Sequence, residues 1–306
     1  MIYIGDRALQ TRKIGDRAVT RVYQGDQMTW GGGPTESRLY VVYPADYEGA
    51  RTVVLEYSQS AAGGTTVDWA DGSPPETPNT TDVTLTHTYN STGRKGYDIK
   101  IAEKPGAHWT PMLGMISSTR EGRGILNGMD LSEAVTEVGR SAFANCTGLS
   151  YASLRGAVII GEAAFSSCTG LSTVAVRATV QEIRSFAFLA ARSISMWFSG
   201  EDFEEAIEAD TIISAFNQAL DDDCDKIEIR AKTIGNNAFA RNYLRTVWLR
   251  DGLETITGNP FWLNHEPLTI YCEADSKPAG WAEDFALVAN GGTKATVVWG
   301  QKTRPW

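Results

Sequence analysis

The sequence has few of the residues on which enzymes and metal proteins depend. Its 306 residues include 3 histidines and 4 cysteines. No C-x-x-C pair occurs and no histidine lies beside a cysteine, so a zinc site has no support. The H-E-x-x-H and G-x-S-x-G motifs and the phosphate-binding P-loop are missing as well. We therefore expect no catalytic, cofactor-binding or metal-binding residues.

Long apolar runs and clustered positive charge are also missing. No stretch approaches the roughly 18 consecutive apolar residues of a membrane span, and the N-terminus has none of the features of a secretory signal. The formal net charge is -9, and the positive residues are scattered, which argues against a nucleic-acid partner. These absences predict that the protein is made in a cytosol and does not insert into a membrane. No heptad pattern favours a coiled-coil trimer.

The sequence does contain one short motif six times. It reads V-G-R-S-A-F at 138–143 and I-G-E-A-A-F at 160–165, and its phenylalanine recurs at intervals of 22, 23, 28, 23 and 22 residues. The six units are numbered repeats 1 to 6 by their phenylalanines, which are Phe143, Phe165, Phe188, Phe216, Phe239 and Phe261. A fixed period in the twenties is typical of a solenoid, in which stacked units bury a shared core.

Each repeat is expected to hold a short helical or turn-like stretch around its phenylalanine, followed by a strand. In repeat 1 the alternating apolar residues of that strand are Leu149, Ala152 and Leu154. One aromatic ring at the same place in every repeat predicts a continuous column, and burial of each ring contributes about 1.5 to 3 kcal/mol. Cys146 and Cys168 share one repeat position and are expected to be buried thiols without a disulfide. Repeat 4 departs most from the motif, which predicts an enlarged loop there.

This pattern resembles the BspA-type bacterial leucine-rich repeats, whose units read close to I-G-x-x-A-F-x-x-C-x-x-L. The resemblance covers 138–271 and implies a leucine-rich-repeat solenoid. Residues 103–137 are interpreted as a connector that also caps the first repeat, because an open solenoid end leaves apolar surface in water. Residues 272–306 are interpreted as a C-terminal cap, in which Trp281 and Trp299 cover the last repeat.

Residues 1–33 carry a second, shorter repeat. Gly-Asp pairs at 5–6, 15–16 and 25–26 each follow a short apolar stretch, and they predict tight turns in a β unit too small for a core of its own. The stretch T-R-V-Y-Q-G-D-Q-M-T-W at 20–30 is similar to the N-terminal attachment segments of phage and prophage tail proteins. A plain β-hairpin that packs on the next domain is the alternative. Three glycines before Pro34 mark a domain boundary.

Residues 34–102 show short strand patterns separated by turn clusters, as in a β-sandwich. The expected strands are 39–43, 52–57, 67–69, 83–86 and 97–101. The stretches V-D-W-A-D-G-S at 67–73 and T-H-T-Y at 86–89 resemble the PKD-type immunoglobulin-like module, with Ala70 where that family usually has glycine. Asp68 and Asp71 are expected to form a turn, because two carboxylates are too few for calcium. His87 is expected to pack or hydrogen-bond against that turn.

The strand positions that point away from the core predict a candidate binding surface. One such residue per repeat gives the column Ser153, Ala175, Phe198, Glu228, Trp248 and Tyr271. Its last four members are the candidate target-binding residues, because exposed rings in a row favour contact with a protein or a glycan. A slip of one residue in repeat 3 would place Trp197 in the column instead of Phe198. The alternative is that a neighbouring domain or another copy of the chain covers these rings.

The sequence therefore predicts a mainly β protein with short helices: an N-terminal β segment, an immunoglobulin-like sandwich and a leucine-rich-repeat solenoid, with no enzymatic activity. The leading hypothesis is a phage or prophage tail-associated receptor-binding or tip protein, assembled in the bacterial cytoplasm and carried on the virion tail. Its repeats would bind a bacterial surface receptor, and residues 1–30 would bind other tail proteins or subunits, homo-oligomers included. The alternative is a bacterial cell-surface adhesin that binds a host protein or glycan. A hydrolase with a PKD accessory module is the weakest alternative, because no catalytic domain is present.

Overall fold

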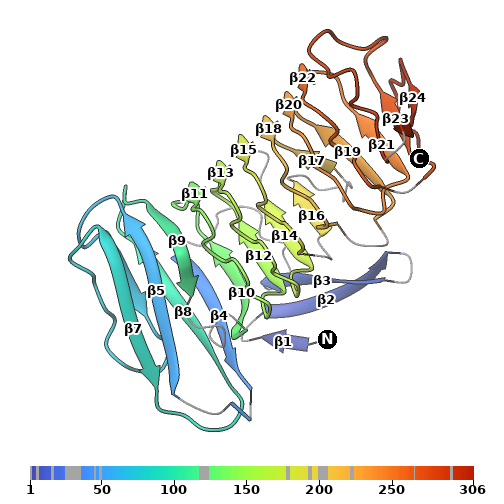
Figure 1. Ribbon diagram of the computed structural model, residues 1–306. Coiled ribbons are helices and arrows are strands. Elements are labelled where there is room, and N and C mark those ends of the chain that lie inside the picture. The colour runs from blue at the N-terminus through green and yellow to red at the C-terminus, as the bar shows by residue number, and fades with distance from the viewer. Residues whose placement is uncertain are drawn as a thin grey trace. The chain divides into compact units, whose positions relative to one another are not determined.

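Figure 1 shows the computed structural model of the protein, whose described residues form strands, turns and loops. The structure describes residues 2–4, 7–14, 17–24, 36–44, 46–47, 50–116, 124–176, 180–191, 195–198, 206–220, 224–264, 266–289 and 292–306. These ranges contain no α-helix, and the prediction of a mainly β protein is confirmed. The chain divides into two units, Met1–Thr35 and Glu36–Trp306.

The first unit is a three-stranded antiparallel sheet in the order β1-β2-β3. Its strands are β1 (Ile2–Ile4), β2 (Arg7–Ile14) and β3 (Arg17–Gln24). Ile4 pairs with Arg7 and Ile14 pairs with Arg17. The Gly-Asp pairs at 5–6 and 15–16, which lie outside the described residues, therefore separate consecutive strands. The predicted small antiparallel β unit is confirmed, whereas residues 25–30 of the predicted attachment segment also lie outside the described residues.

Two sheets form the region that follows. Its strands are β4 (Glu36–Tyr43), β5 (Arg51–Gln59), β6 (Thr65–Asp68), β7 (Asp82–Tyr89), β8 (Lys95–Glu103) and β9 (Trp109–Ile116). One sheet contains β4-β8-β6 and the other is β7-β5-β9. The Tyr57 hydroxyl in β5 shares a 2.8 Å hydrogen bond with the Thr65 hydroxyl in β6, and Tyr89 of β7 stacks on Tyr97 of β8. The two sheets therefore contact each other through a common aromatic core.

Strand β10 (Leu126–Leu131) links this region to the solenoid. It pairs antiparallel with β4 and parallel with β12 (Tyr151–Leu154), so one seven-stranded sheet runs β16-β14-β12-β10-β4-β8-β6. Glu103 Oε1 lies at the junction and accepts hydrogen bonds from Ser37 Oγ (3.2 Å), Trp109 Nε1 (2.6 Å) and Ser132 Oγ (2.7 Å). Because these donors come from both regions, a shared hydrogen-bond network joins them.

The solenoid consists of two rows of parallel strands. The short strands form the sheet β11-β13-β15-β18-β20-β22, and they are β11 (Glu137–Val138), β13 (Ile159–Ile160), β15 (Glu182–Ile183), β18 (Thr211–Ile212), β20 (Thr233–Ile234) and β22 (Thr255–Ile256). The longer strands are β12, β14 (Thr173–Val176), β16 (Ser195–Phe198), β17 (Ala206–Glu208), β19 (Lys226–Arg230), β21 (Thr246–Leu249), β23 (Thr269–Cys272) and β24 (Thr296–Val298). The predicted β-solenoid of about six turns is confirmed.

The row of longer strands changes sheet between repeats 3 and 4. Strand β16 is the end strand of the seven-stranded sheet, and β17 is the first strand of a five-stranded sheet, β17-β19-β21-β23-β24. The longest interval between core phenylalanines, from Phe188 to Phe216, therefore holds two longer strands where its neighbours hold one. Residues 199–205 of this interval, and residues 221–223 of the loop predicted for repeat 4, lie outside the described residues.

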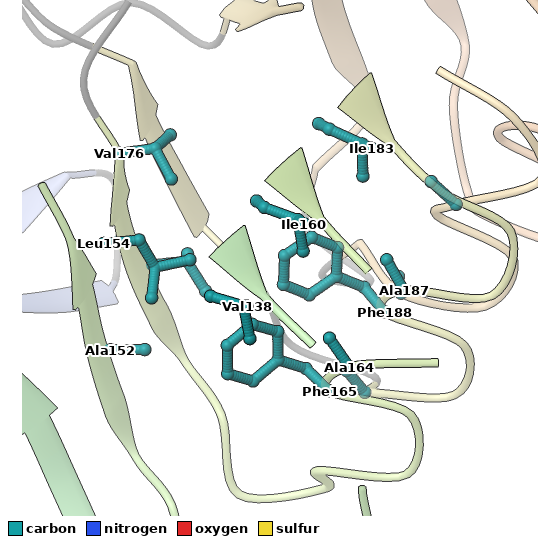
Figure 2. Packing of buried hydrophobic residues seen from close by; sticks show 14 of the residues in the cluster. Val138, Ala152, Leu154, Ile160, Ala164, Phe165, Val176, Ile183, Ala187 and Phe188 are labelled. Atoms are coloured by element: carbon teal, nitrogen blue, oxygen red, sulfur yellow. The ribbon is translucent and has the colours of Figure 1, made fainter. Parts of the chain in front are cut away.

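The six phenylalanines form the predicted column. Consecutive rings are stacked, with centroids 5.2 to 5.9 Å apart and interplanar angles of 5 to 17°. All six side chains are fully buried. Figure 2 shows Phe165 and Phe188 inside the solenoid, among side chains such as Ile160 and Leu154 from both rows of strands. The column is the spine of the solenoid core, and each ring depends on its neighbours in the adjacent repeats.

The segments around the phenylalanines are turns, so the turn-like alternative is correct, and the described residues contain none of the expected short helices. In repeat 1, Ser141 has φ 51° and Asn145 has φ 62°, and the equivalent residues two before and two after the ring have positive φ in most repeats. An α-helix needs consecutive residues with negative φ, so left-handed residues spaced four apart interrupt it. Hydrogen bonds between repeats replace helical ones, as when Phe143 N donates to Ala164 O (2.9 Å).

One buried position, three residues after each ring, changes its residue type along the solenoid. Cys146 and Cys168 occupy it in repeats 1 and 2, and no disulfide joins any of the four cysteines. Burial raises the pKa of the Cys168 thiol well above its usual value, and its Sγ donates to Phe143 O (3.0 Å). Asn242 and Asn264 occupy the position in repeats 5 and 6, where their amides bind backbone groups of two repeats. The predicted buried thiols are confirmed.

Aromatic side chains cover the end of the solenoid after repeat 6. Trp281 lies between Phe285 (ring centroids 5.2 Å apart) and Trp299 (5.8 Å), and its indole N–H donates to Leu253 O (3.1 Å). Residue 281 also forms a parallel bridge with Ile256 in the row of short strands. This aromatic group therefore continues the core beyond the last phenylalanine.

Candidate recognition surface

The strand register defines the predicted outward column. Ser153, Ala175 and Trp197 are consecutive partners in the seven-stranded sheet, whereas Phe198 pairs with Val176, which is buried. The placement of Phe198 in the column is therefore wrong by one residue, and the alternative register with Trp197 is correct. Nothing further is described for the side chains of β16.

The second half of the column is in register as predicted. Glu228, Trp248 and Tyr271 are consecutive partners on β19, β21 and β23. Their surroundings differ from the expectation of an exposed row, because Glu228 and Trp248 are 1% and 3% exposed. Tyr271 remains partly exposed. The structure thus brings three of the four candidate residues together, and it places two of them under other parts of the chain.

Residues 301–306, which we name the strap, cover Trp248. The indole N–H of Trp248 donates to Gln301 O (3.1 Å), and the ring of Trp306 meets the Trp248 ring edge-to-face at 6.3 Å. Arg250 lies over the Trp248 ring, with its guanidinium carbon 4.3 Å from the ring centroid. The expectation that Trp248 is exposed is therefore wrong, because the chain itself supplies the cover.

Glu228 is the centre of a buried ionic cluster. Its Oε1 accepts hydrogen bonds from Arg230 Nε (2.7 Å) and Arg250 NH1 (2.8 Å), and its Oε2 lies 3.9 Å from Arg304 Nε in the strap. Glu273 adds a second carboxylate, 3.1 Å from Arg250 Nε. Burial of a carboxylate is costly unless cations compensate it. Arg230, at the end of β19, and Arg250, directly after β21, compensate the charge of Glu228. The expectation that Glu228 is exposed is wrong for this reason.

Exposed apolar side chains lie instead at the turn edge, which we define as the residues within four positions of each core phenylalanine. Five large apolar side chains among the described residues are at least 40% exposed, and four of them lie at the turn edge, one in each of repeats 3 to 6. They are Phe186, Ile213, Tyr243 and Leu263. The equivalent positions in repeats 1 and 2 hold small or polar residues, such as Ser141, Ala163, Asn145 and Ser167.

Two of these exposed residues also have an unfavourable backbone conformation. Phe186 has φ 61° and Leu263 has φ 58°. The left-handed region costs a bulky L-residue roughly 1 to 2 kcal/mol and is better tolerated by glycine or asparagine. The same positions of repeats 1 and 2 are also left-handed, so the conformation belongs to the repeat. The exposed apolar side chains distinguish repeats 3 to 6, and they make the turn edge of these repeats a stronger candidate surface than the covered column.

The turn at 67–76 forms a separate polar cluster. His87 stacks on Trp69 with ring centroids 4.7 Å apart, and its Nε2 is 2.8 Å from Asp71 Oδ2. Hydrogen bonds from Ser73, followed by the contact with His87, lower the pKa of Asp71 to about 2. Asp68 Oδ1 accepts a hydrogen bond from the N–H of Ala70, whose φ is 61°. The predicted turn-forming role of both aspartates and the contact with His87 are confirmed.

Metal-ligating side chains do not converge in the described part of the chain, where no group of three or more His, Cys, Asp or Glu could hold an ion. Within the same residues, no helix is long and apolar enough to cross a membrane. His108 contacts Ala134 O through Nδ1 (3.2 Å), and His265 lies outside the described residues.

Comparison with known families bears on the solenoid. Residues 122–208 match the family model of the BspA type leucine rich repeat region, described with 6 copies. The solenoid is similar to BspA-type repeats. The searches of curated proteins and of solved structures gave no match. The BspA-like repeats favour a surface-binding function. The match ends before repeats 4 to 6, which hold most of the exposed apolar residues, and before the strap, which follows the repeats.

Sequence reasoning missed the partners that cover the column. The strap residues Lys302, Arg304 and Trp306 form no repeat and belong to no recognisable motif, so only their alternation of cationic and aromatic side chains could have indicated a docked segment. Phe186 and Leu263 had a signal that could have been found. Each stands at a repeat position that holds small or polar residues in repeats 1 and 2.

Proposed function

We propose that the protein is a non-enzymatic recognition protein of the adhesin type, whose BspA-like repeats bind a macromolecule on a cell surface. The observation that carries this proposal is the presence of one large exposed apolar residue at the turn edge of each of repeats 3 to 6. Exposed aromatic and aliphatic anchors are typical of protein interfaces, because burial of each in a partner's pocket releases apolar surface from water. The partner that fits best is therefore a surface protein.

The two-sheet region at 36–116 would serve as a spacer in this proposal. Its W-A-D-G-S turn with the stacked His87 supports its identity as a PKD-like, immunoglobulin-like module. The glutamate network around Glu103 connects this module to the solenoid. Such a connection would hold the recognition repeats in a fixed direction.

The binding experiment uses the fluorescently labelled full chain on bacterial and host cells, before and after treatment of the cells with protease or with periodate. We expect saturable binding that protease abolishes and that periodate, which destroys glycans, leaves intact. Loss of binding after periodate alone would assign the target to a glycan. Absence of saturable binding to every cell type would contradict the proposal.

A tail-associated role in a phage or prophage is the second candidate. The separate three-stranded sheet of Met1–Thr35 favours it, because so small an antiparallel unit needs a further partner for stability. In that setting the same repeats would bind a bacterial receptor, and the first unit would bind other tail subunits. Antibody against residues 138–306 should then label the tail in electron micrographs of virions, and unlabelled tails would reject this candidate.

A further inference from the structure

The strap lies on a surface whose chemistry complements its own. Two carboxylates of that surface, Glu228 and Glu273, are held in place by neighbouring arginines, because Arg230 and Arg250 bind them at 2.7 to 3.1 Å. Trp248 lies beside them, with the Arg250 guanidinium over its ring. The receiving surface is therefore built by β19, β21, β23 and the residues that follow them, independently of the strap.

The strap contributes cations and an aromatic ring to this surface. Lys302 Nζ donates to the backbone oxygen of Glu273 and lies 3.5 Å from Asp275 Oδ1. Arg304 faces Glu228, and Trp306 meets Trp248. Spaced two residues apart, these three side chains place alternate positions of an extended segment against acidic and aromatic partners.

The ion pairs of the strap are longer than those within the receiving surface. Arg304 Nε is buried without a hydrogen bond and stays 3.9 Å from Glu228 Oε2, whereas Arg230 and Arg250 bind Oε1 at 2.7 and 2.8 Å. The Lys302 side chain is 53% exposed, and exposed ion pairs contribute only about 0 to 1 kcal/mol. A segment that satisfies Glu228 Oε2 fully could therefore take the place of the strap.

We propose that the outer face formed by Glu228, Trp248, Tyr271 and Glu273 is a binding site for a basic and aromatic polypeptide segment of a partner protein, and that the strap occupies this site until the partner displaces it. The partner segment carries Lys or Arg and a Trp at alternate positions, like residues 302–306. The site lies on a different surface from the turn edge, so each can be tested without the other.

The experiment measures binding of a labelled peptide with the sequence of residues 299–306, W-G-Q-K-T-R-P-W, by fluorescence anisotropy. The proteins are the full chain and its triple variant Lys302→Ala/Arg304→Ala/Trp306→Ala, in which the strap is weakened. We expect the triple variant to bind the peptide about tenfold or more tightly than the unmodified chain. A peptide with alanine in place of its lysine, arginine and last tryptophan should not bind. Addition of Glu228→Gln to the triple variant should weaken binding of the original peptide by about tenfold.

A folded triple variant that does not bind the peptide would overturn the proposal, as would equal binding by both proteins. Hydrogen exchange of the unmodified chain gives an independent test if the triple variant does not fold. The amides of Gly300 and Gln301, which donate to Ala274 O and Cys272 O, should then exchange about a hundredfold faster than the amides of β21 and β23. Equal protection of both groups would show a fixed strap and overturn the proposal.

Discussion

Repeats 1 and 2 differ from repeats 3 to 6 although all six share one core. The phenylalanine column runs through both groups with nearly constant ring spacing. Outside the column, the first two repeats have small or polar turn-edge residues and buried cysteines, whereas the later ones have exposed apolar residues and, in repeats 5 and 6, buried asparagines. The difference shows that stacking constrains the interior, while the edge is free to specialise. The first repeats serve as scaffold in this account.

The largest expected effect is the loss of stability in Phe188→Ala, which is compared with Phe186→Ala in the same repeat. Phe188→Ala should lower the free energy of unfolding by about 3 to 5 kcal/mol, because it leaves a cavity in the column. Phe186→Ala, two residues away, should lower it by only about 1 kcal/mol, because that ring is 44% exposed and its loss leaves no closed cavity. Urea unfolding followed by circular dichroism measures both. Similar losses for the two variants would mean that Phe186 also supports the core.

The next largest effect on the free energy of unfolding is expected at the buried position three residues after each core phenylalanine. Asn242 accepts hydrogen bonds from Ala219 N (3.1 Å) and Leu220 N (3.0 Å) and donates to Phe216 O (2.8 Å). Asn242→Ala leaves these buried groups without partners and should cost about 3 kcal/mol. Cys168→Ala, at the same position in repeat 2, should cost about 1 kcal/mol, because it removes one sulfur and one weak hydrogen bond. Equal costs in denaturant unfolding would contradict this difference between the repeats.

The smallest expected effect comes from exchanging the residue types at the turn-edge position two residues after the core phenylalanine. Leu263→Asn in repeat 6 should stabilise the fold by about 1 kcal/mol, because asparagine tolerates the left-handed conformation better than leucine. The reverse change at the equivalent position of repeat 1, Asn145→Leu, should destabilise it by a similar amount. Thermal unfolding of both variants measures the shifts. A loss of stability in Leu263→Asn would show that Leu263 has a structural role.

The repeat period explains why so much of the solenoid was predictable. A ring at a fixed offset in six units is enough to place Phe143 to Phe261 in one column, and alternation is enough to find the strands. The register of β16 was left open because the apolar residues at 194–198 do not alternate strictly with polar ones. The turns were mistaken for short helices because Ala163 and Phe186 are not residue types that indicate a left-handed conformation.

Contacts between distant segments were not predictable in the same way. Pairing of β10 with β4 joins residues about ninety positions apart, as in the partners Asp130 and Arg38, and no periodic signal links them. Docking of the strap on Trp248 is also non-local, because it joins residues 53 positions apart. For this reason the register of Glu228, Trp248 and Tyr271 was correct, while the expected exposure of Glu228 and Trp248 was not.

The central claim is that the apolar turn edge of repeats 3 to 6 binds the surface target. The most direct test compares the double variant Phe186→Asn/Leu263→Asn with the matched control Ser141→Asn/Ser167→Asn, which changes the equivalent positions in repeats 1 and 2. The dissociation constant for target-bearing cells should rise at least about tenfold in the first variant, since two apolar anchors are lost, and should not change in the control. Unchanged affinity in the folded Phe186→Asn/Leu263→Asn variant, or equal losses in both variants, would contradict the account.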